Sequence, residues 1–241
     1  MPRPRQIFAT SGITNPPEGW TPPQRSALVT HAISLTGVKC AKVCYIATAM
    51  GDSPLVLDQV RAAFDGFDDA ELSHLALFPQ PNVDDVRSYL LARDLIWVGG
   101  GSVVNLLAVW RAHRLDEILR ECWEAGVVLG GGSAGSICWH IGGTTDSFTN
   151  DLDPVTNGLA FLPYSNGVHH DVADQPRRVR YHELIGAGAL PAGYATDDGT
   201  GVHYIDTEVV EAVRTLGGTD AYHVSRNGDG VIERPLNARL L

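Results

Sequence analysis

Residues Val127 to Trp139 read V-V-L-G-G-G-S-A-G-S-I-C-W: an apolar run breaks into glycines, presents one serine and resumes as small residues. Within this stretch, residues 131–135 (G-G-S-A-G) fit the G-x-S-x-G pattern of a nucleophile elbow. In such an elbow a sharp strand-to-helix turn exposes the serine hydroxyl in a strained backbone conformation. Flanking glycines are needed because a Cβ there would collide with a neighbouring strand or helix. Ser133 is therefore a candidate nucleophile, and a purely structural glycine turn is the alternative.

A serine hydroxyl is a weak nucleophile, so it needs a histidine base nearby and an acid that fixes the tautomer of that base. The chain has nine histidines. His140 follows Ser133 by seven residues on the expected helix, which is too far for direct contact. His169 and His170 follow an apolar run in the sequence G-V-H-H-D, which reads as a loop. Because a loop can deliver a base to the rim of a sheet, both residues are candidate bases.

A second glycine turn, residues 99–101, follows a short apolar segment at 95–98. In doubly wound sheets ligands bind at the carboxyl ends of the strands, so both glycine turns would share one rim. A dinucleotide-binding turn is disfavoured because G-x-G-x-x-G requires glycine where Val104 stands. A phosphate-binding Walker loop is disfavoured because no lysine follows Gly135.

Short apolar runs alternate with helix-like segments through the first two thirds of the chain, which predicts a parallel sheet covered by helices. The expected strands are 43–49, 72–78, 95–98 and 127–129, and the expected helices are 55–64, 83–92, 104–110 and 115–125. Residues 146–201 read as loop-rich. The tail reads as short strands of an antiparallel edge at 202–204, 208–213, 221–224 and 231–233, with turns at 227–228 and 229–230.

Composition narrows the class of protein. A chain of 241 residues can bury one large core, so we expect a single domain over 1–241. The net charge is −10, and the one basic cluster is residues 177–180 (R-R-V-R), so we expect a poor nucleic-acid binder and no nucleic-acid partner. We expect no membrane partner, since no apolar run reaches about 18 residues, and no signal peptide. Four cysteines without C-x-x-C spacing favour reduced thiols, and hence a cytoplasmic protein.

Taken together, these residues resemble the peptidase E family, the serine aspartyl dipeptidases, whose relatives include cyanophycinase. The matching pieces run in order over about half of the chain: Val98-Gly99-Gly100-Gly101, Gly132-Ser133-Ala134-Gly135, Thr144-Thr145-Asp146, Gly158-Leu159 with Leu162-Pro163, the His169 loop, and Pro176-Arg177-Arg178-Val179-Arg180 with Glu183-Leu184. The resemblance implies a doubly wound, mostly parallel α/β sheet, similar to flavodoxin and class I glutamine amidotransferases, with a C-terminal antiparallel edge. It disfavours glutamine amidotransferase activity, because that elbow uses a cysteine and Cys138 lies five residues past the serine.

Carried over by position, the nucleophile of the family falls on Ser133 and its histidine on His169. His170 then takes a position that is aromatic in the family. The triad carboxylate falls on Asp198 in one alignment, where the family carries Glu, and on Asp146 in another. We expect Asp198, because an acid from a later loop can reach the far nitrogen of His169 without crossing the elbow.

Asp146 is the second choice for the acid, and Asp197 and Asp171 are less favoured.

The resemblance also implies an oxyanion hole made of backbone N–H groups, here those of Gly100 or Gly101 together with Ala134. Two departures concern the pocket: Ser102 stands where the family often has asparagine, and residues 9–12 (A-T-S-G) replace a glycine-rich strand end.

Substrate choice depends on Arg177. In the dipeptidase branch an arginine in this stretch binds the side-chain carboxylate of an N-terminal aspartate, and a guanidinium suits that role because it binds carboxylates bidentately. The alternative is that Arg177, Arg178 and Arg180 form a solvated charged face. The resemblance implies a serine exopeptidase that cleaves Asp-X dipeptides through an acyl-enzyme, without metal or organic cofactor, as a homodimer or higher homo-oligomer.

Two alternatives remain open at this stage. One is a different substrate on the same Ser-His-acid machinery, such as the aspartyl-arginine polymer of cyanophycinase or cleavage at a peptide's C-terminus. The other is a non-catalytic binding protein that has a peptidase-like fold.

Overall fold

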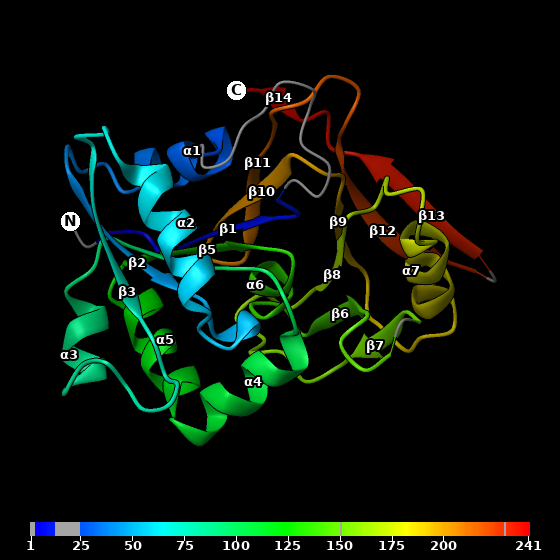
Figure 1. Cartoon of the computed structure of the whole chain (residues 1–241). Helices are drawn as coiled ribbons and strands as arrows, with labels where there is room; N and C mark the ends of the chain where they lie inside the picture. Colours follow the sequence, from blue (N-terminus) through cyan, green and yellow to red (C-terminus); the bar gives the residue numbers. More distant parts are fainter. Residues whose placement is uncertain (1–2, 13–24, 150, 229) are drawn as a thin grey trace.

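The computed structural model describes residues 3–12, 25–149, 151–228 and 230–241, and it is built on two β-sheets (Figure 1). The strands of the first sheet are β1 (Gln6–Thr10), β2 (Ala41–Ile46), β3 (Ala70–Leu75), β4 (Leu95–Val98), β5 (Val128–Gly132), β10 (Thr200–Ile205), β11 (Glu208–Arg214) and β14 (Arg239–Leu240). Those of the second sheet are β6 (Gly142–Thr145), β7 (Asp153–Val155), β8 (Ser165–Val168), β9 (Gly193–Thr196), β12 (Ala221–Asn227) and β13 (Gly230–Pro235).

The first sheet has the strand order β14-β11-β10-β1-β5-β4-β2-β3. The five strands from β1 to β3 in this order pair in parallel, whereas β10 pairs antiparallel with β1 and β11 antiparallel with β10. The expected mostly parallel sheet with a C-terminal antiparallel edge is therefore confirmed. Strand β4 has the predicted bounds, and β5 extends past the predicted end at 129 because its glycines continue the ladder with β1.

Helices cover both faces of the first sheet (Figure 1). The helical segments are α1 (Ala27–Leu35), the 3-10 turn η1 (Thr48–Met50), α2 (Pro54–Phe64), α3 (Val86–Leu91), α4 (Val103–Ala112), α5 (Leu115–Glu124), α6 (Ala134–Ile137) and α7 (Arg177–Gly186). Helices α1 and α2 lie on one face, and α3, α4 and α5 on the other. Among the described residues, no helix combines the length and apolar character needed to cross a membrane.

Side chains at the helix starts explain where several helices begin. Ser26 and Ser102 accept hydrogen bonds from the backbone amides of Val29 and Asn105, so they cap α1 and α4. Asparagine caps a helix as well as serine does. The departure from the family at Ser102 therefore preserves the start of α4 beside the first glycine turn.

The second sheet has the order β13-β12-β9-β8-β6-β7 and corrects the expectation for 146–201. That stretch read as loop-rich, but it contains β7, β8, α7 and β9. Strand β8 has the sequence S-N-G-V and carries almost no β-forming residues. It forms a strand because neighbouring elements fill the space around it, rather than because of residue propensity. A Cβ on Gly167 would lie 3.0 Å from Cδ1 of Tyr181 on α7. The tail strands also divide: β10 and β11 extend the first sheet, while β12 and β13 complete the second.

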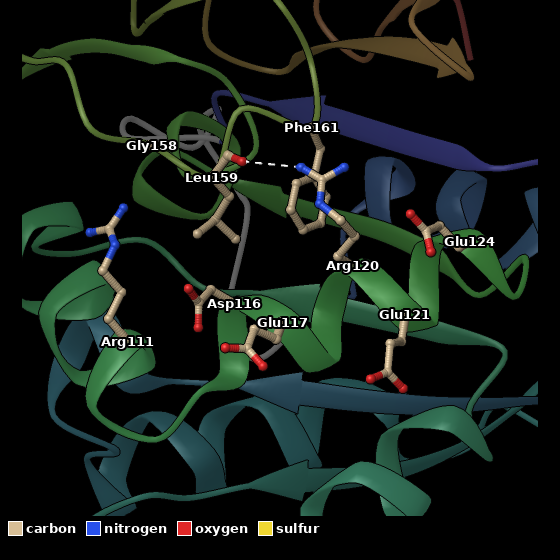
Figure 2. Close-up of a pocket in the computed structure, with 9 residues that line it drawn as sticks. All are labelled: Arg111, Asp116, Glu117, Arg120, Glu121, Glu124, Gly158, Leu159 and Phe161. Carbon is tan, nitrogen blue, oxygen red and sulfur yellow. Dashed lines mark hydrogen bonds between the residues drawn. The ribbon is translucent and has the colours of Figure 1, made fainter.

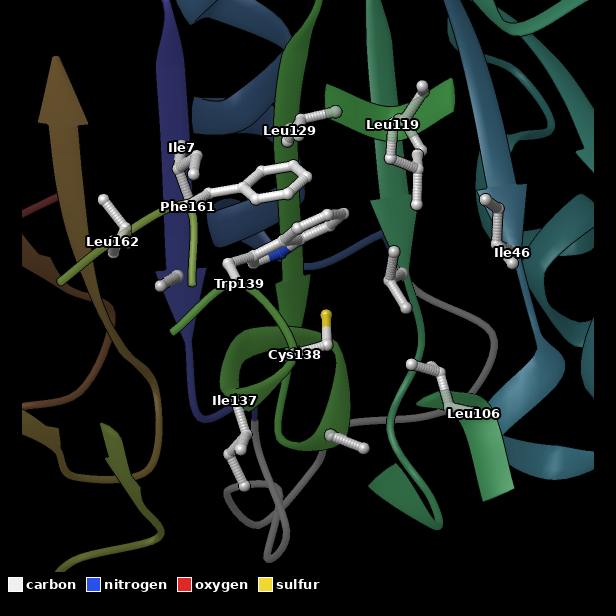
Figure 3. Packing of buried hydrophobic residues seen from close by; sticks show 14 of the residues in the cluster. Ile7, Ile46, Leu106, Leu119, Leu129, Ile137, Cys138, Trp139, Phe161 and Leu162 are labelled. Atoms are coloured by element: carbon white, nitrogen blue, oxygen red, sulfur yellow. The ribbon is translucent and has the colours of Figure 1, made fainter. Parts of the chain in front are cut away.

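An aromatic cluster lies beneath the nucleophile elbow (Figure 3). Trp139 is fully buried, and its ring centre lies 5.8 Å from those of both Trp110 and Phe161. Ile137 of α6 and Leu129 of β5 belong to the same core cluster. This cluster also includes residues of the second sheet, so the two sheets share one core below the elbow.

We expect Trp139→Ala to lower the free energy of unfolding by about 3–5 kcal/mol, because it removes a fully buried tryptophan side chain from this aromatic cluster and leaves a cavity. Urea denaturation at constant pH measures the loss. Leu55→Ala is the control, since Leu55 is 68% exposed and its truncation should change stability by about 0.5 kcal/mol or less. A loss for Trp139→Ala as small as that of the control would contradict the assignment.

Candidate active site

Ser133 stands at the turn between β5 and α6 with φ 56° and ψ −115°. Non-glycine residues rarely adopt such angles, and the cost is borne only where surrounding contacts fix the backbone. Here the Ser133 amide donates to the carbonyl of Thr10 at 2.9 Å, and the amides of Ser136 and Ile137 donate to the Ser133 carbonyl. The turn therefore has the strained geometry expected of an elbow.

The glycines of the elbow allow it to lie directly against the end of β4. A Cβ on Gly135 would stand 2.2 Å from the carbonyl oxygen of Val98, and one on Gly131 would stand 2.5 Å from the same atom. Real Cβ atoms do not approach a carbonyl so closely. Glycine at these two positions brings Ser133 beside the glycine turn that follows Val98.

His169 comes from the other sheet, as the first residue after β8. Its φ is also 56°, and its backbone amide donates to Oγ of Ser11 at 2.8 Å. Ser11, which follows β1, in turn donates to the carbonyl of Thr196 at the end of β9, at 2.7 Å. Ser11 thus links the first sheet to the histidine loop. The sequence showed this serine only as a departure from the family, and no local pattern pointed to its role.

Ser133, His169 and Asp198 form a continuous hydrogen-bonded chain. Nε2 of His169 lies 3.0 Å from Oγ of Ser133, and Nδ1 lies 2.6 Å from Oδ1 of Asp198. The side chains of His169 and Asp198 are 13% and 8% exposed. Asp198 lies in the link between β9 and β10, where the chain passes from the second sheet to the first. This arrangement can activate a hydroxyl and orient the imidazole that takes its proton.

The neighbouring acids have other partners. Oδ1 of Asp171 accepts the backbone amide of Asp198 at 2.8 Å, so Asp171 helps to hold the loop. Oδ2 of Asp197 accepts the hydroxyl of Tyr222 at 3.1 Å, and burial raises the pKa of Asp197. Asp171 and Asp197, the less favoured choices for the acid, therefore lie beside Asp198 rather than against the imidazole of His169.

Asp146 does not contact His169 but forms an ion pair with Arg177. Its Oδ2 accepts from Nη2 of Arg177 at 2.8 Å and from Nε2 of Gln175 at 3.3 Å. Of the two carboxylates that the sequence left open, the structure brings Asp198 to the imidazole. Asp146 lies instead on the side of the cleft where Arg177 stands.

Three backbone amides lie near the Ser133 hydroxyl or at the start of its helix. A Cβ on Gly100 would lie 3.3 Å from Cβ and 3.9 Å from Oγ of Ser133. Gly101 has φ 126° and packs against the Ala49 carbonyl, where a Cβ would come within 2.4 Å. Within the described part of the chain, the amides of Gly100, Gly101 and Ala134 donate to no protein acceptor. They are available to stabilise an oxyanion.

A cleft of about 500 Å³ opens over these groups, lined by Gly101, Ser133, Asp146, His169, Gln175 and Arg177 among others. Arg177 is the first residue of α7 and is only 7% exposed. Burial lowers the pKa of its guanidinium, and the carboxylate of Asp146 opposes that effect. The expected substrate-binding residue Arg177 thus lies in the same cleft as Ser133, and two of its five N–H donors already bind protein groups.

A second groove, of about 390 Å³, lies between α4, α5 and the loop 158–161 (Figure 2). Arg120 donates there to the carbonyl of Leu159 at 3.4 Å, and its guanidinium lies 4.1 Å from the ring centre of Phe161. The described residues that line it include no serine, cysteine or histidine. Of these two pockets, the first cleft is the one lined by a serine and a histidine in hydrogen-bond contact.

Glu233 on β13 contacts both α7 and the loop that carries His169 and His170. Its Oε2 lies 2.7 Å from Nε2 of both His170 and His182, while Arg178 pairs with Oε1. Burial would raise the pKa of Glu233, but the hydrogen bonds from the two histidines outweigh it and lower the pKa to about 2.

Among the described residues, His170, His182 and Glu233 are the group whose possible metal ligands converge, within 4.8 Å of one another. Oε1 of the carboxylate already pairs with Arg178. Nδ1 of His170 is buried and has no hydrogen-bond partner within the described residues, so an ion on Nε2 would move the proton to a nitrogen that faces no acceptor there. The group is better described as a hydrogen-bonded support than as a metal centre.

A family model described as Peptidase family S51 matches residues 21–212. The chain belongs to peptidase family S51. The chain is 40% identical over 202 residues to the uncharacterized peptidase YgaJ of Bacillus subtilis, covering 83% of this chain and 85% of that protein. It is 32% identical over 97 residues to Peptidase E of Shewanella denitrificans, covering 39% and 40% of the two chains. The S51 membership confirms the resemblance to peptidase E and makes this protein a peptidase.

Solved structures share the fold of this chain at low sequence identity. A peptidase from an acI-B1 actinobacterium superposes with a TM-score of 0.68 at 15% identity, over 98% of this chain and 96% of that one. A candidate peptidase E protein from Listeria monocytogenes EGD-e gives a TM-score of 0.61 at 16% identity, over 88% and 100%. This chain thus shares its α/β fold with these two peptidase structures.

We expect Glu233→Gln to destabilise the protein in a pH-dependent way. Because the folded pKa of about 2 lies below the ordinary 4.5, this group stabilises the fold fully above pH 4.5. That stability, at most about 3 kcal/mol, is lost as the pH falls from 4.5 towards 2. Urea unfolding at pH 5 and pH 3 should show a gap between wild type and variant that narrows at pH 3.

Glu183→Gln provides the control for this measurement. Glu183 lies on α7 with a side chain 57% exposed and pairs only with Arg180 among charged groups of the described chain. Its removal should change stability by less than about 1 kcal/mol at either pH. A gap for Glu233→Gln that stays constant between pH 5 and pH 3 would refute the linkage.

Proposed function

We propose that this S51 peptidase is a serine exopeptidase that releases an N-terminal aspartate from dipeptides and short peptides. The observation that carries the proposal is the hydrogen bond of 3.0 Å between Nε2 of His169 and Oγ of Ser133, with Asp198 on the opposite nitrogen. Nucleophile, base and orienting acid then act as one unit.

In the first step, Oγ of Ser133 attacks the scissile carbonyl while His169 accepts the hydroxyl proton at Nε2. Asp198 stabilises the resulting imidazolium through Nδ1, and the oxyanion accepts hydrogen bonds from Ala134 and from Gly100 or Gly101. His169 then donates its proton to the leaving amine, which breaks the peptide bond and leaves an acyl-enzyme.

In the second step, water gives a proton to His169 and attacks the ester carbonyl of Ser133. Collapse of the second tetrahedral intermediate returns the proton to Oγ and releases the free carboxylic acid. Both steps balance with water as the only co-reactant.

Arg177 supports aspartate as the substrate residue. Its side chain is 8% exposed and lines the cleft, and its guanidinium donates through Nε to Gln175 at 2.8 Å and through Nη2 to Asp146. A guanidinium has five N–H donors, so several remain for a substrate carboxylate. In a partly dry site this contact discriminates strongly for a charged side chain.

We expect Ser133→Ala to lower kcat on aspartyl p-nitroanilide by at least about 10⁴-fold, because the acyl-enzyme cannot form. Circular dichroism should show an unchanged fold. A fluorophosphonate probe should label the wild type and leave Ser133→Ala unmodified. Ser88→Ala, an exposed serine on α3, is the control and should retain full activity and labelling. Activity retained in Ser133→Ala would overturn the mechanism.

We expect Arg177→Lys to lower kcat/KM for aspartyl p-nitroanilide by about 100-fold or more, because lysine keeps the charge but loses the bidentate fork. Hydrolysis of alanyl p-nitroanilide, however slow, should change far less. Arg178→Lys is the matched control, since the neighbouring arginine pairs with Glu233 outside the cleft. Equal losses on both substrates would remove Arg177 as the specificity residue.

A further inference from the structure

We propose that Asp146 binds the α-ammonium group of the substrate, so that Asp146 and Arg177 together recognise one zwitterionic residue at the N-terminus. This inference rests on the proposed function and adds a binding role for a carboxylate that the catalytic chain does not use. Under this proposal the Asp146–Arg177 ion pair is more than a structural contact, because it determines which substrate residue the cleft binds.

The first observation is where the Asp146 carboxylate points. Its side chain is 43% exposed, against 8% for its partner Arg177, and both line the cleft with Ser133. The open side of this ion pair is therefore its anionic end. A cation entering the cleft meets a carboxylate that is accessible and already partly shielded from bulk water.

The second observation is that Asp146 has a free oxygen. Within the described part of the chain, its hydrogen bonds all use Oδ2, which accepts from Arg177 and Gln175. A carboxylate has about four acceptor positions. Oδ1 can therefore accept from an ammonium group while Oδ2 keeps its contact with the guanidinium.

The third observation is that the backbone around Asp146 is held on both sides. Asp146 directly follows β6, and the next residue, Ser147, accepts the amide of Val103 at the start of α4 at 3.0 Å. Oγ of Ser147 also lies 2.7 Å from Oγ1 of Thr145. The carboxylate thus projects from a segment held between β6 and the start of α4, which suits a group that must fix a ligand's orientation.

The charge pattern of the pair matches an N-terminal aspartate. That residue alone in a peptide carries an ammonium and a carboxylate on neighbouring carbons, so both charges lie within a few ångströms of each other. The carboxylate of Asp146 and the guanidinium of Arg177 are likewise in contact, at 2.8 Å. A residue whose nitrogen is acylated offers no cation, and it would cover Oδ1 of Asp146 without supplying an ammonium group to pair with it.

A competing explanation is that Asp146 only holds Arg177 in place. In that case its loss would weaken every substrate that uses Arg177, whether or not the nitrogen is free. Recognition of ammonium predicts a loss confined to substrates with a free amine. The two roles are thus separated by the state of the substrate's nitrogen.

The test compares aspartyl p-nitroanilide with N-acetyl-aspartyl p-nitroanilide on wild type and Asp146→Asn. We expect the wild type to prefer the free amine by about 100-fold or more in kcat/KM, and Asp146→Asn to reduce this preference to about 10-fold or less. The change should come from the free-amine substrate. Asp174→Asn, an exposed carboxylate of the same cleft, should keep the wild-type preference. Equal losses of Asp146→Asn on both substrates would overturn the inference.

A binding measurement separates failure of this inference from failure of the proposed function. Calorimetric titration of Ser133→Ala with L-aspartate and with N-acetyl-L-aspartate reports recognition without turnover. Preferential binding of L-aspartate that disappears in Ser133→Ala/Asp146→Asn supports the ammonium site even if the wild type hydrolyses neither substrate. Equal binding of both ligands by Ser133→Ala overturns it, whatever the activity of the wild type.

Discussion

The hydrogen bond between Ser133 and His169 joins two β-sheets, and the rest of the structure determines whether it can form. Ser133 ends a strand of the first sheet and His169 follows a strand of the second, so a small rotation between the sheets would separate them. Asp198 lies on the segment that passes from one sheet to the other. Ser11 adds a hydrogen-bonded link from β1 to the His169 backbone. The positions of Ser133, His169 and Asp198 are thus fixed by the junction between the sheets rather than by any one element.

Strain at this junction is balanced by packing beneath it. Ser133 and His169 both have φ 56°, and each such residue costs about 1–3 kcal/mol. The buried Trp139 and Phe161 form a floor in the core cluster that includes residues of both sheets. A Cβ on Gly131 or Gly135 would lie 2.2–2.5 Å from backbone carbonyl oxygens, so the elbow can adopt this conformation only with glycine at both positions. The hydroxyl is therefore presented by a rigid turn, which lowers the reorganisation needed during the reaction.

Helix α7 divides the basic stretch of the sequence into separate roles. Arg177 turns into the cleft, Arg178 pairs with Glu233 on β13, and Arg180 donates to the carbonyl of Leu152 at 3.0 Å. The reading of these arginines as one solvated charged face fails, because successive helical residues point in directions about 100° apart. Glu233 also accepts from His170, the neighbour of the proposed base. Helix α7 and the loop that carries His169 and His170 are consequently both held by Glu233.

The sequence by itself determined the features that depend on local backbone pattern. The strand at 95–98, the alternation that gives the parallel sheet, and the G-x-S-x-G elbow all follow from hydrophobic periodicity and from glycine spacing. Only the tertiary structure decided which carboxylate meets His169, because Asp146 and Asp198 lie 23 residues before and 29 residues after it and no spacing rule separates them. Strand β8 and the bridging role of Ser11 could not be predicted from the sequence for the same reason. Both depend on contacts between distant segments rather than on residue propensities.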